Sequence, residues 1–407
     1  MSPLPFYQRY PERPCAVCDG AGRERLFRQT FAEMSSGSLL QGYDVVVCAK
    51  CGFCFGDHIP AQSDFDEHYR EMSKYESQGQ GGKETELDLV RFKAMADSII
   101  PALPDRDACL LDIGCATGCL LGLFKERGYA HVLGYDPSLV CAQTAKELYD
   151  VRVITGTFHE IKQTLAQEPL FACVTLTGVL EHIQDIGPSL RDIRQLLVGR
   201  GLLFIEVPDA ASFVQWLGPP FQEFSTEHIN FFSSTSLDNL MRRFGFVRVF
   251  SHQITRELIN DTRMPVVTAL YRKDEERQPF VPARDTETER GLLDYIRRSE
   301  ETENEITRTL EGLVRSAKPI IVWGVGTHTM HLLTTSQLSQ ANITAFVDSN
   351  SHYQGKRLNG ILILAPSQLR DRTESILISS GVYQAVIEKQ IREDLRLTNE
   401  LIKLYPR

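Results

Sequence analysis

Between residues 109 and 273, short apolar runs of strand length alternate with amphipathic segments of helix length. The apolar runs lie at 109–113, 131–135, 151–154, 173–177 and 202–207, and the amphipathic segments at 120–127, 139–149 and 188–197. Such alternation is typical of a parallel sheet whose strands are joined by crossover helices. Two further apolar runs, 246–254 and 266–271, follow a predicted helix at 236–244 with no long helix between them. They predict an antiparallel strand pair at the edge of the sheet.

The pattern changes on both sides of this segment. The first 60 or so residues are rich in Cys, Gly and Pro with little helical periodicity, and a charged stretch leads from there into the sheet. After it, residues 284–317 carry leucine and isoleucine at helical spacing, and a second α/β pattern begins at 319. We therefore predict an α/β protein with a zinc-binding domain (1–62), a cofactor-binding domain with a helical lead-in (63–275), a helical linker (276–317) and a C-terminal α/β domain (318–407).

Bulk composition narrows the function classes. A chain of 407 residues with 42% hydrophobic residues is long enough for two to three domains. A net charge of −9, without a cluster of Lys and Arg, argues against a nucleic-acid partner. The apolar runs are too short to span a membrane, and the N-terminus lacks the pattern of a secretion signal. With ten cysteines, this predicts a cytoplasmic protein with reduced thiols, some of them bound to metal.

Two Cys-x-x-Cys pairs, Cys15/Cys18 and Cys48/Cys51, lie in the first domain. Zinc prefers four ligands in a tetrahedron, and each tight Cys-x-x-Cys turn supplies two thiolates to one ion. We predict a structural Zn²⁺ site, because four cysteines leave no open position for chemistry. A redox dithiol is the alternative, which two paired turns fit poorly. Cys54 is a spare thiol that we assign to packing.

A glycine-containing loop, Asp112-Ile-Gly114-Cys-Ala-Thr-Gly118, directly follows one predicted strand and precedes a predicted helix. Its glycines let the backbone approach a ligand at the carboxyl end of the strand. Asp136 ends the next strand, 22 residues after Gly114, where a carboxylate can accept both hydroxyls of a ribose. The pattern predicts an adenosine-type ligand, and leaves NAD and S-adenosylmethionine open.

This segment resembles the class I S-adenosylmethionine-dependent methyltransferases. The resemblance rests on the acidic loop, on Tyr135-Asp136-Pro137-Ser138, on Thr177-Gly-Val-Leu-Glu181-His182 and on the closing antiparallel pair. It implies S-adenosyl-L-methionine as cofactor, with Asp112 against the methionine part and Asp136 on the ribose. Glu181 and His182 alternatively cap the next helix. The implied cofactor-binding residues are Tyr75 (otherwise a surface or packing tyrosine), Asp112, Gly114, Cys115, Gly118, Asp136, Pro137, Thr157, Phe158, Thr177, Gly178 and Val179.

The order of the domains resembles the three-part sugar C-methyltransferases of deoxysugar pathways. The markers are Cys48-Ala-Lys-Cys51-Gly52, Glu227-His228-Ile-Asn-Phe-Phe232-Ser233, Val322-Trp-Gly324-Val-Gly326, Phe346-Val-Asp348-Ser-Asn350 and Gln354-Gly355-Lys356. The resemblance implies that the C-terminal domain has no cofactor of its own and completes the pocket for a nucleotide-activated keto sugar. The chain departs from the family at Ser225-Thr226, where the family has Tyr-His, and at Thr327-His328, where it has a small residue and Lys-Gly. These departures leave oxygen open as the acceptor atom.

Methyl transfer from a sulfonium is an in-line displacement, so the enzyme mainly positions donor and acceptor. The acceptor must lose a proton, which calls for a base that titrates near neutrality. We predict His228 as this base and Glu227 as the residue that orients it; alternatively, His228 anchors its loop. The alternative functions are an O-methyltransferase of a glycan or natural-product precursor, an NAD-dependent oxidoreductase and a non-catalytic zinc scaffold.

The C-terminal domain carries a faint dinucleotide pattern, Gly324-Val-Gly326 with Asp348, that lacks a third glycine. The pattern allows NAD, the substrate nucleotide or a structural role. His328 and His331 are three residues apart at a predicted helix start. They either meet a diphosphate or pack inside the domain.

Overall fold

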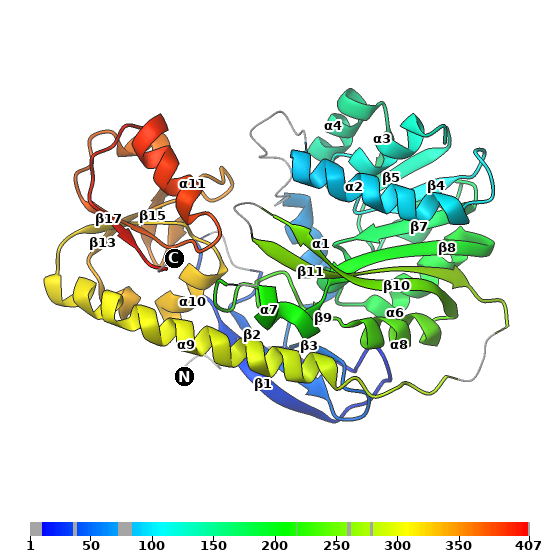
Figure 1. Ribbon diagram of the computed structural model, residues 1–407, viewed down its shortest axis with the longest axis horizontal. Coiled ribbons are helices and arrows are strands. Elements are labelled where there is room, and N and C mark those ends of the chain that lie inside the picture. The colour runs from blue at the N-terminus through cyan, green and yellow to red at the C-terminus, as the bar shows by residue number, and fades with distance from the viewer. Residues whose placement is uncertain are drawn as a thin grey trace.

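The computed structural model describes residues 10–35, 39–71, 84–216, 218–258, 262–276 and 280–405, and these residues form three sheets (Figure 1). The central sheet has the strand order β10-β11-β8-β7-β4-β5-β6. Its strands are β4 (Leu110–Ile113), β5 (Val132–Asp136), β6 (Arg152–Thr155), β7 (Phe171–Thr177), β8 (Leu197–Pro208), β10 (Phe246–Glu257) and β11 (Arg263–Lys273).

The central sheet confirms the predicted fold class. Strands β4 to β8 pair in parallel, and β11 and β10 close one edge as an antiparallel pair. The chain starts in the middle at β4, runs outward to β6, and then returns to β7 on the other side of β4. This is a Rossmann-like sheet, with its crevice where the strand order reverses. Strand β8 begins five residues before the predicted run, because Leu197 already pairs with Phe171 of β7.

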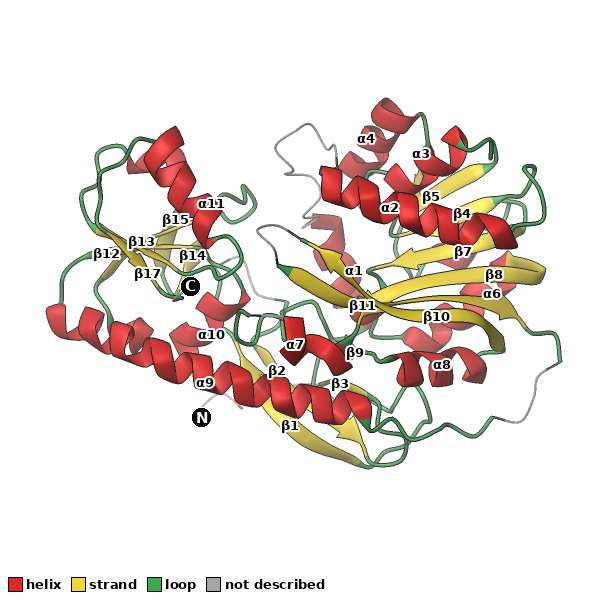
Figure 2. Cartoon of the chain, viewed as in Figure 1, coloured by secondary structure: helices red, strands yellow, loops and turns green. Residues whose placement is uncertain are grey.

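Both faces of the central sheet are covered by helices (Figure 2). Successive strand residues point to opposite faces, so Leu110 and Leu202 pack with α2 and α3, whereas Leu111 and Leu203 pack with α6 and α8. Full burial on both faces explains why these strands are apolar throughout. The helices of this domain are α2 (Glu86–Ile99), α3 (Cys119–Glu126), α4 (Leu139–Tyr149), α5 (Ile161–Thr164), α6 (Ile186–Leu196), α7 (Phe213–Trp216) and α8 (Ser234–Arg243).

The N-terminal sheet has the order β1-β2-β3-β9 and is antiparallel. Strands β1 (Arg23–Thr30) and β2 (Gly42–Cys48) form a hairpin between the two cysteine pairs, and β3 (Cys54–Asp57) follows. Strand β9 (Asn230–Phe231) comes from the long segment after β8 of the central domain. Helix α1 (Gln62–Glu71) then leaves this sheet toward the central domain. The N-terminal sheet is therefore completed by a strand that lies about 170 residues further along the chain.

Helix α9 (Glu287–Ser316) runs along the N-terminal sheet to the C-terminal domain (Figure 1). That domain has a sheet of order β14-β15-β13-β12-β16-β17, parallel except for β14. One core cluster joins residues of β1, β2, α9 and β12, so the three parts share buried surface. The C-terminal elements are β12 (Ile320–Trp323), α10 (Thr327–Thr335), β13 (Ile343–Val347), β14 (Arg357–Leu358), β15 (Ile361–Leu364), β16 (Ser375–Ile378), α11 (Gln384–Lys389) and β17 (Leu401–Lys403).

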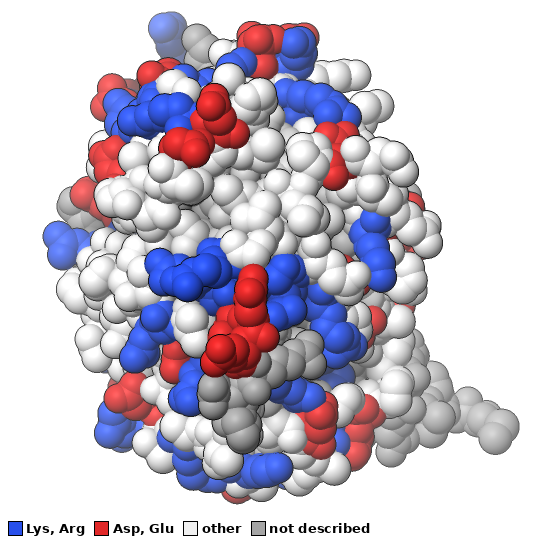
Figure 3. Space-filling view, turned by 90° about the vertical axis from the view of Figure 1, so that its right-hand side faces the viewer, with Lys and Arg blue, Asp and Glu red and all other residues white. Residues whose placement is uncertain are grey.

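The charge on the side face of the central domain is mixed. Figure 3 shows Lys and Arg side chains that gather around a group of Asp and Glu side chains there. Among the helices of the described residues, none is long and apolar enough to cross a membrane.

Asp285, directly before α9, connects three parts of the structure. Its side chain is 1% exposed and accepts hydrogen bonds from the hydroxyl groups of Ser233 (2.6 Å) and Thr288 (2.7 Å) and from the backbone N–H of Glu287 and Thr288. Its own N–H donates to the carbonyl oxygen of Cys51 (2.8 Å). The carboxylate of Asp285 thus holds the starts of α8 and α9, and its backbone N–H holds a predicted zinc turn.

We expect Asp285→Ala to lower the free energy of unfolding by about 2–4 kcal/mol, because two buried hydroxyl groups and two N–H groups lose their acceptor. Urea unfolding measures the change. The control is Asp294→Ala, which removes only an ion pair with Arg297 that is partly exposed to solvent. That control should change stability by no more than about 0.5 kcal/mol. Equal effects of the two variants would contradict the role of Asp285.

Candidate active site

A cavity lies at the carboxyl ends of β4, β5 and β7, where the strand order reverses. Most of the predicted cofactor residues come together on its wall: Gly114, Asp136, Pro137, Thr157, Phe158, Thr177, Gly178 and Val179. The predicted orienting residue Glu227 also lines it. The residues that the sequence predicts for the cofactor thus line one cavity at the carboxyl edge of the sheet.

Four of the predicted residues that the structure describes do not line the cavity, namely Asp112, Cys115, Gly118 and His228. Asp112 is 2% exposed and receives a hydrogen bond from the hydroxyl of Thr175, below the cavity floor. Cys115 is buried, and Gly118 lies at the start of α3 with φ of 82°. His228 lies behind the wall, and Tyr75 falls outside the described residues. Asp112, Cys115 and Gly118 thus shape the loop from beneath.

Gly114 is the closest point of the loop to the cavity. Its φ is 73°, a conformation that favours glycine, and an added Cβ would lie 2.6 Å from Cγ2 of Val179. Its N–H donates to the carbonyl oxygen of Tyr135 (2.7 Å), which fixes the loop on β5. A side chain here would push into the cavity wall, so the geometry requires glycine.

Asp136 holds the loop and also faces the cavity. Its Oδ2 accepts the N–H of Ala116 (2.8 Å), and its Oδ1 accepts the N–H of Ser138 (2.9 Å). Two backbone N–H groups thus fix the orientation of the carboxylate at the cavity wall.

His228 lies beside a carboxylate, but not the one that we predicted. Its Nδ1 is 3.2 Å from Oε2 of Glu223, at ion-pair distance but without the alignment of a hydrogen bond. Glu223 is 4% exposed, whereas Glu227 points to the cavity wall. The chain turns between them because the hydroxyl of Ser225 accepts the N–H of both Glu227 and His228. This turn brings Glu223 back against the imidazole, and no local pattern in the sequence signals it.

A second histidine connects His228 to the cavity. The ring of His182 lines the cavity, lies 4.9 Å from the ring of His228, and has its Nδ1 3.1 Å from the carbonyl oxygen of Glu227. Glu181, His182 and His228 offer ligand atoms within 4.8 Å of one another. Such a group can pass a proton or hold a cation. From the sequence, Glu181 and His182 could belong to the methyl-donor motif or cap the next helix.

Helix α1 covers one side of the cavity through Gln62, Asp66 and Tyr69. Gln62 accepts the N–H groups of Gln184 (2.8 Å) and Asp185 (3.2 Å), which fastens the helix to the segment after His182. These three residues were not predicted, because the charged composition of the stretch is typical of an exposed surface. The regular spacing of Gln62, Asp66 and Tyr69 on one helix face was the available signal.

The segment 219–231 contacts every part of the molecule. Phe221 stacks on Phe27 of β1 with ring centres 4.5 Å apart, and its N–H donates to the hydroxyl of Ser299 on α9 (3.1 Å). Pro219 packs against Gly381 of the C-terminal domain, where an added Cβ would lie 2.9 Å from the proline ring. Glu223 and His228 are carried by this segment, so all three parts of the chain fix their position.

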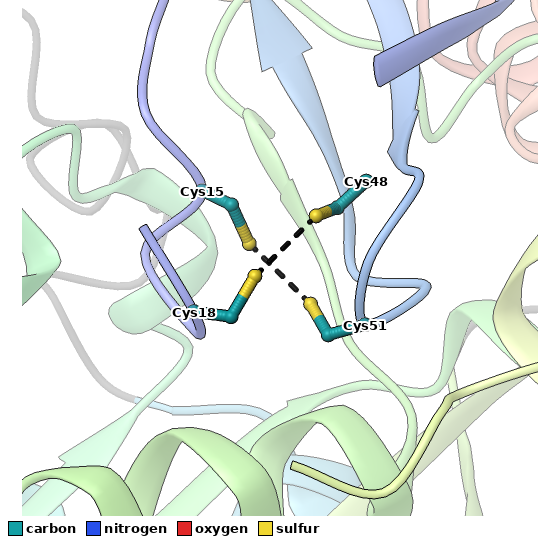
Figure 4. Close-up of side chains that lie close together, drawn as sticks. All are labelled: Cys15, Cys18, Cys48 and Cys51. Atoms are coloured by element: carbon teal, nitrogen blue, oxygen red, sulfur yellow. Dashed lines mark hydrogen bonds between the residues drawn. The ribbon is translucent and has the colours of Figure 1, made fainter. Parts of the chain in front are cut away.

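The four cysteines of the two pairs lie together at one end of the N-terminal sheet (Figure 4). The Sγ atoms of Cys15 and Cys51 are 3.5 Å apart, as are those of Cys18 and Cys48, and all four lie within 4.8 Å of one another. Tetrahedral zinc with bonds of about 2.3 Å to sulfur separates its ligands by about 3.8 Å. The arrangement therefore matches the size of a four-thiolate metal site. Cys54 lies outside it, with its thiol directed at the carbonyl oxygen of Gly52 (3.6 Å).

Comparison with known proteins agrees with this geometry. Residues 88–249 match a family model described as "Methyltransferase domain", and residues 316–402 match one described as "C2185-like, N-terminal". The comparison thus identifies residues 88–249 as a methyltransferase domain. The first match begins in α2 and ends in β10, so it covers the cavity, its glycine loop and its acidic residue at the end of β5.

Other relatives add little about the reaction. An uncharacterized protein of Haemophilus influenzae is 33% identical over 112 residues, which are 26% of this chain and 43% of that protein, so the match spans less than half of its length. A methyltransferase from Methanosarcina mazei (14% identical, 44% of this chain, 98% of that chain) superposes with a TM-score of 0.36. One from Mesorhizobium loti (14% identical, 45% and 100%) also gives 0.36. Superpositions of this kind do not bear on substrate or mechanism.

The burial of Asp112 makes stability depend on pH. Burial raises the pKa of Asp112 to about 7, against about 3.9 in an unfolded chain. The folded protein therefore holds the proton more tightly, and this residue costs stability as pH rises from about 4 to about 7. We expect the stability of Asp112→Asn minus that of the unmodified protein to increase by about 2 kcal/mol when the pH is raised from 5 to 8.

Urea unfolding at both pH values, without added ligand, measures this difference. Asp105→Asn is the matched control, because Asp105 is exposed. That variant should follow the unmodified protein at both pH values. A constant difference between Asp112→Asn and the unmodified protein would contradict the prediction.

Proposed function

We propose that the protein is an S-adenosylmethionine-dependent methyltransferase that acts on a nucleotide-activated deoxy or keto sugar, or a similarly polar small molecule, with carbon favoured as the acceptor. The pairing of Glu223 with His228 directly behind the cavity carries the proposal, because carbon methylation needs a base. The order of zinc domain, methyltransferase domain and C-terminal α/β domain, which resembles sugar C-methyltransferases, gives further support.

The residues on the cavity wall suit S-adenosylmethionine. Asp136 lines the cavity at the end of β5, where a carboxylate suits the ribose hydroxyls, and Thr157 and Phe158 offer a surface for the adenine. Gly114 and Gly178, with φ of 73° and 70°, let the backbone approach the methionine part closely. When bound, S-adenosylmethionine supplies an electrophilic methyl group.

His228 is the proposed base of the reaction. An unprotonated imidazole takes the proton from the carbon beside a ketone, or from a hydroxyl group in the case of an oxygen acceptor. Glu223 stabilises the imidazolium that results, because its carboxylate lies 3.2 Å from Nδ1. His182 lies between His228 and the cavity and offers a route for the proton. Helix α1 shields this site from water on one side.

We also propose that Cys15, Cys18, Cys48 and Cys51 bind one structural Zn²⁺. The distances among the four sulfur atoms support this, and so does Gly20, where an added Cβ would lie 3.1 Å from the Sγ of Cys18. Without metal, burial raises the pKa of the Cys18 thiol to about 12. Zinc has to displace such protons, so its binding weakens as pH falls.

We expect Cys48→Ser to release the zinc and to lower stability by several kcal/mol, because metal-binding energy in such domains is folding energy on the order of 10 kcal/mol. Elemental analysis and thermal unfolding measure the two effects. The control Cys109→Ser, a cysteine outside the cluster, should keep one zinc per chain. A full zinc content in Cys48→Ser, or no zinc in the unmodified protein, would contradict the proposed zinc site.

For the base, we expect His228→Ala to lower turnover by roughly 10²–10⁴-fold while affinity for S-adenosylmethionine stays near normal. The measurement uses methyl-labelled donor and a panel of nucleotide-linked keto sugars. Deuterium exchange from solvent into the carbon beside the ketone reports proton removal separately from methyl transfer. His131→Ala is the control, because His131 is exposed and directly precedes β5, at the end of the strand away from the cavity.

Glu223→Gln tests the partner of this base. It should move the acid limb of the pH–rate profile to lower pH, because the protonated imidazole loses its ion pair. Full activity in His228→Ala would move the base elsewhere, with His182 next. Label found only on protein or nucleic acid would reject the substrate class, and an O-methyl ether would replace carbon with oxygen as the acceptor.

A further inference from the structure

A second crevice lies in the C-terminal domain, at the carboxyl ends of β12, β13 and β16. Its volume is about 370 Å³. The strand β12 lies between β13 and β16, so the strand order reverses here as it does in the central sheet. Open parallel sheets bind ligands at this position. The residues that line the crevice include none that line the methyl-donor cavity.

An acidic residue holds the glycine turn of this crevice. The N–H of Gly324 donates to the carbonyl oxygen of Val347 (2.8 Å). Oδ2 of Asp348 accepts the N–H of Val325 (2.9 Å), and Oδ1 accepts the N–H of Asn350 (2.8 Å). The carboxylate is thereby fixed on the wall of the crevice.

The methyl-donor cavity has the same set of hydrogen bonds. There the N–H of Gly114 donates to the carbonyl oxygen of Tyr135 (2.7 Å). The two oxygens of Asp136 accept the N–H of Ala116 (2.8 Å) and of Ser138 (2.9 Å). Each acidic residue thus directly follows the residue that accepts the glycine N–H, and each binds one N–H of the glycine turn and one N–H two residues after itself. By this likeness, the role proposed for Asp136 toward a ribose diol extends to Asp348.

The remaining wall of the crevice suits a neutral ligand with an apolar, planar end. Tyr383 and Val386 line it and are 52% and 38% exposed, although both are large and apolar. Ser349, Ser380 and Gln390 supply hydroxyl and amide groups. The described residues that line the crevice include no lysine and no arginine. A nucleobase can stack on the exposed aromatic side chain, whereas a diphosphate would find no cation.

The two histidines at the start of α10, His328 and His331, do not supply that cation. The imidazole of His328 contacts the hydroxyl of Tyr405 through Nδ1 and a carboxylate oxygen of Glu303 through Nε2 (3.0 Å). Burial lowers the pKa of His328, so the ring is neutral at neutral pH. His331 packs on Phe221 with ring centres 4.9 Å apart. Both histidines therefore serve packing, and Glu303 adds negative charge that opposes a diphosphate.

We propose that this crevice binds a ribonucleoside, with the ribose diol on Asp348 and the base against Tyr383 and Val386. The site is separate from the methyl-donor cavity, and the inference does not depend on which acceptor the enzyme methylates. The ligand is either a free nucleoside or the nucleoside end of a larger molecule, including that of the acceptor itself.

Gly326 provides a selective test. It lines the crevice, its φ of −73° is open to any residue, and an added Cβ would meet no atom within 4 Å. A valine there should leave the fold intact and fill the space of the ligand. Gly312 on α9 also has no atom within 4 Å of an added Cβ and lies outside the crevice, so Gly312→Val is the matched control.

The experiment titrates the full-length protein with adenosine, guanosine, cytidine and uridine, and follows binding by calorimetry and ligand-observed NMR. We expect at least one of them to bind, and Gly326→Val to weaken it by roughly tenfold or more, with Gly312→Val unchanged. The 2′-deoxy form should bind roughly tenfold more weakly, because it loses one hydrogen bond to a carboxylate. Tyr383→Ala, at an exposed position, is a second variant that should weaken binding without affecting folding.

Two results would overturn the inference: no binding of any of the four nucleosides to the unmodified protein, or binding that neither Gly326→Val nor Tyr383→Ala weakens. Asp136→Ala should keep this binding while it loses S-adenosylmethionine, which separates the two sites. Competition with the sugar acceptor in the methyl-transfer assay then identifies the crevice as the acceptor's own nucleoside site. Binding without competition identifies a free nucleoside.

Discussion

The position of the active-site histidines depends on one buried cation, the guanidinium of Arg13. It is 5% exposed and donates hydrogen bonds to the carbonyl oxygens of Ile229 (3.3 Å) and Gln184 (2.9 Å) and to the side chain of Asn230 (3.2 Å). Its backbone N–H donates to Asp57 (2.7 Å). Burial lowers the pKa of Arg13 to about 10, so the charge persists at neutral pH and has to keep its partners. One side chain thereby joins the N-terminal sheet to the segments that follow His182 and His228.

This network makes the metal site part of the active-site architecture. Arg13 lies two residues before Cys15, and β3, which follows Cys51, pairs with β9, which follows His228. A four-thiolate site that orders the two turns therefore also orders the strand on which the proposed base is fixed. Asn230 adds to this, because its amide donates to the carbonyl oxygens on both sides of His182 (2.9 and 2.8 Å). The N-terminal sheet thus holds the segment that carries His228 in place.

The parts that the sequence predicts are those set by local physics. Continuous apolar runs of strand length, a glycine turn between strand and helix, and an acid at the next strand end each leave a pattern in neighbouring residues, so the sheet, the loop and the position of Asp136 at a strand end were predictable. The partner of His228 was not, because Glu223 reaches it only through the turn at Ser225. The pairing of β9 with β3 was equally hidden, since two short segments far apart in the chain carry no shared periodicity. Tyr69 was missed because it lies in a charged stretch, and it reaches the cavity only through the position of α1 against the central domain.

The segment 219–231 connects the C-terminal crevice, the pair of Glu223 and His228, and the methyl-donor cavity. Gln222 lines the C-terminal crevice, the next residue, Glu223, contacts His228, and Glu227 lines the methyl-donor cavity. The two pockets are therefore connected by a few residues of backbone. The near end of the segment is held by α9 and the C-terminal domain, and the far end by Arg13 and β9. Because both ends are fixed by packed elements, a shift of the C-terminal domain relative to the N-terminal sheet has to be taken up between them, where the carboxylate meets the imidazole. The distance of 3.2 Å between those two groups is thus a property of the whole three-part assembly and not of the central domain alone.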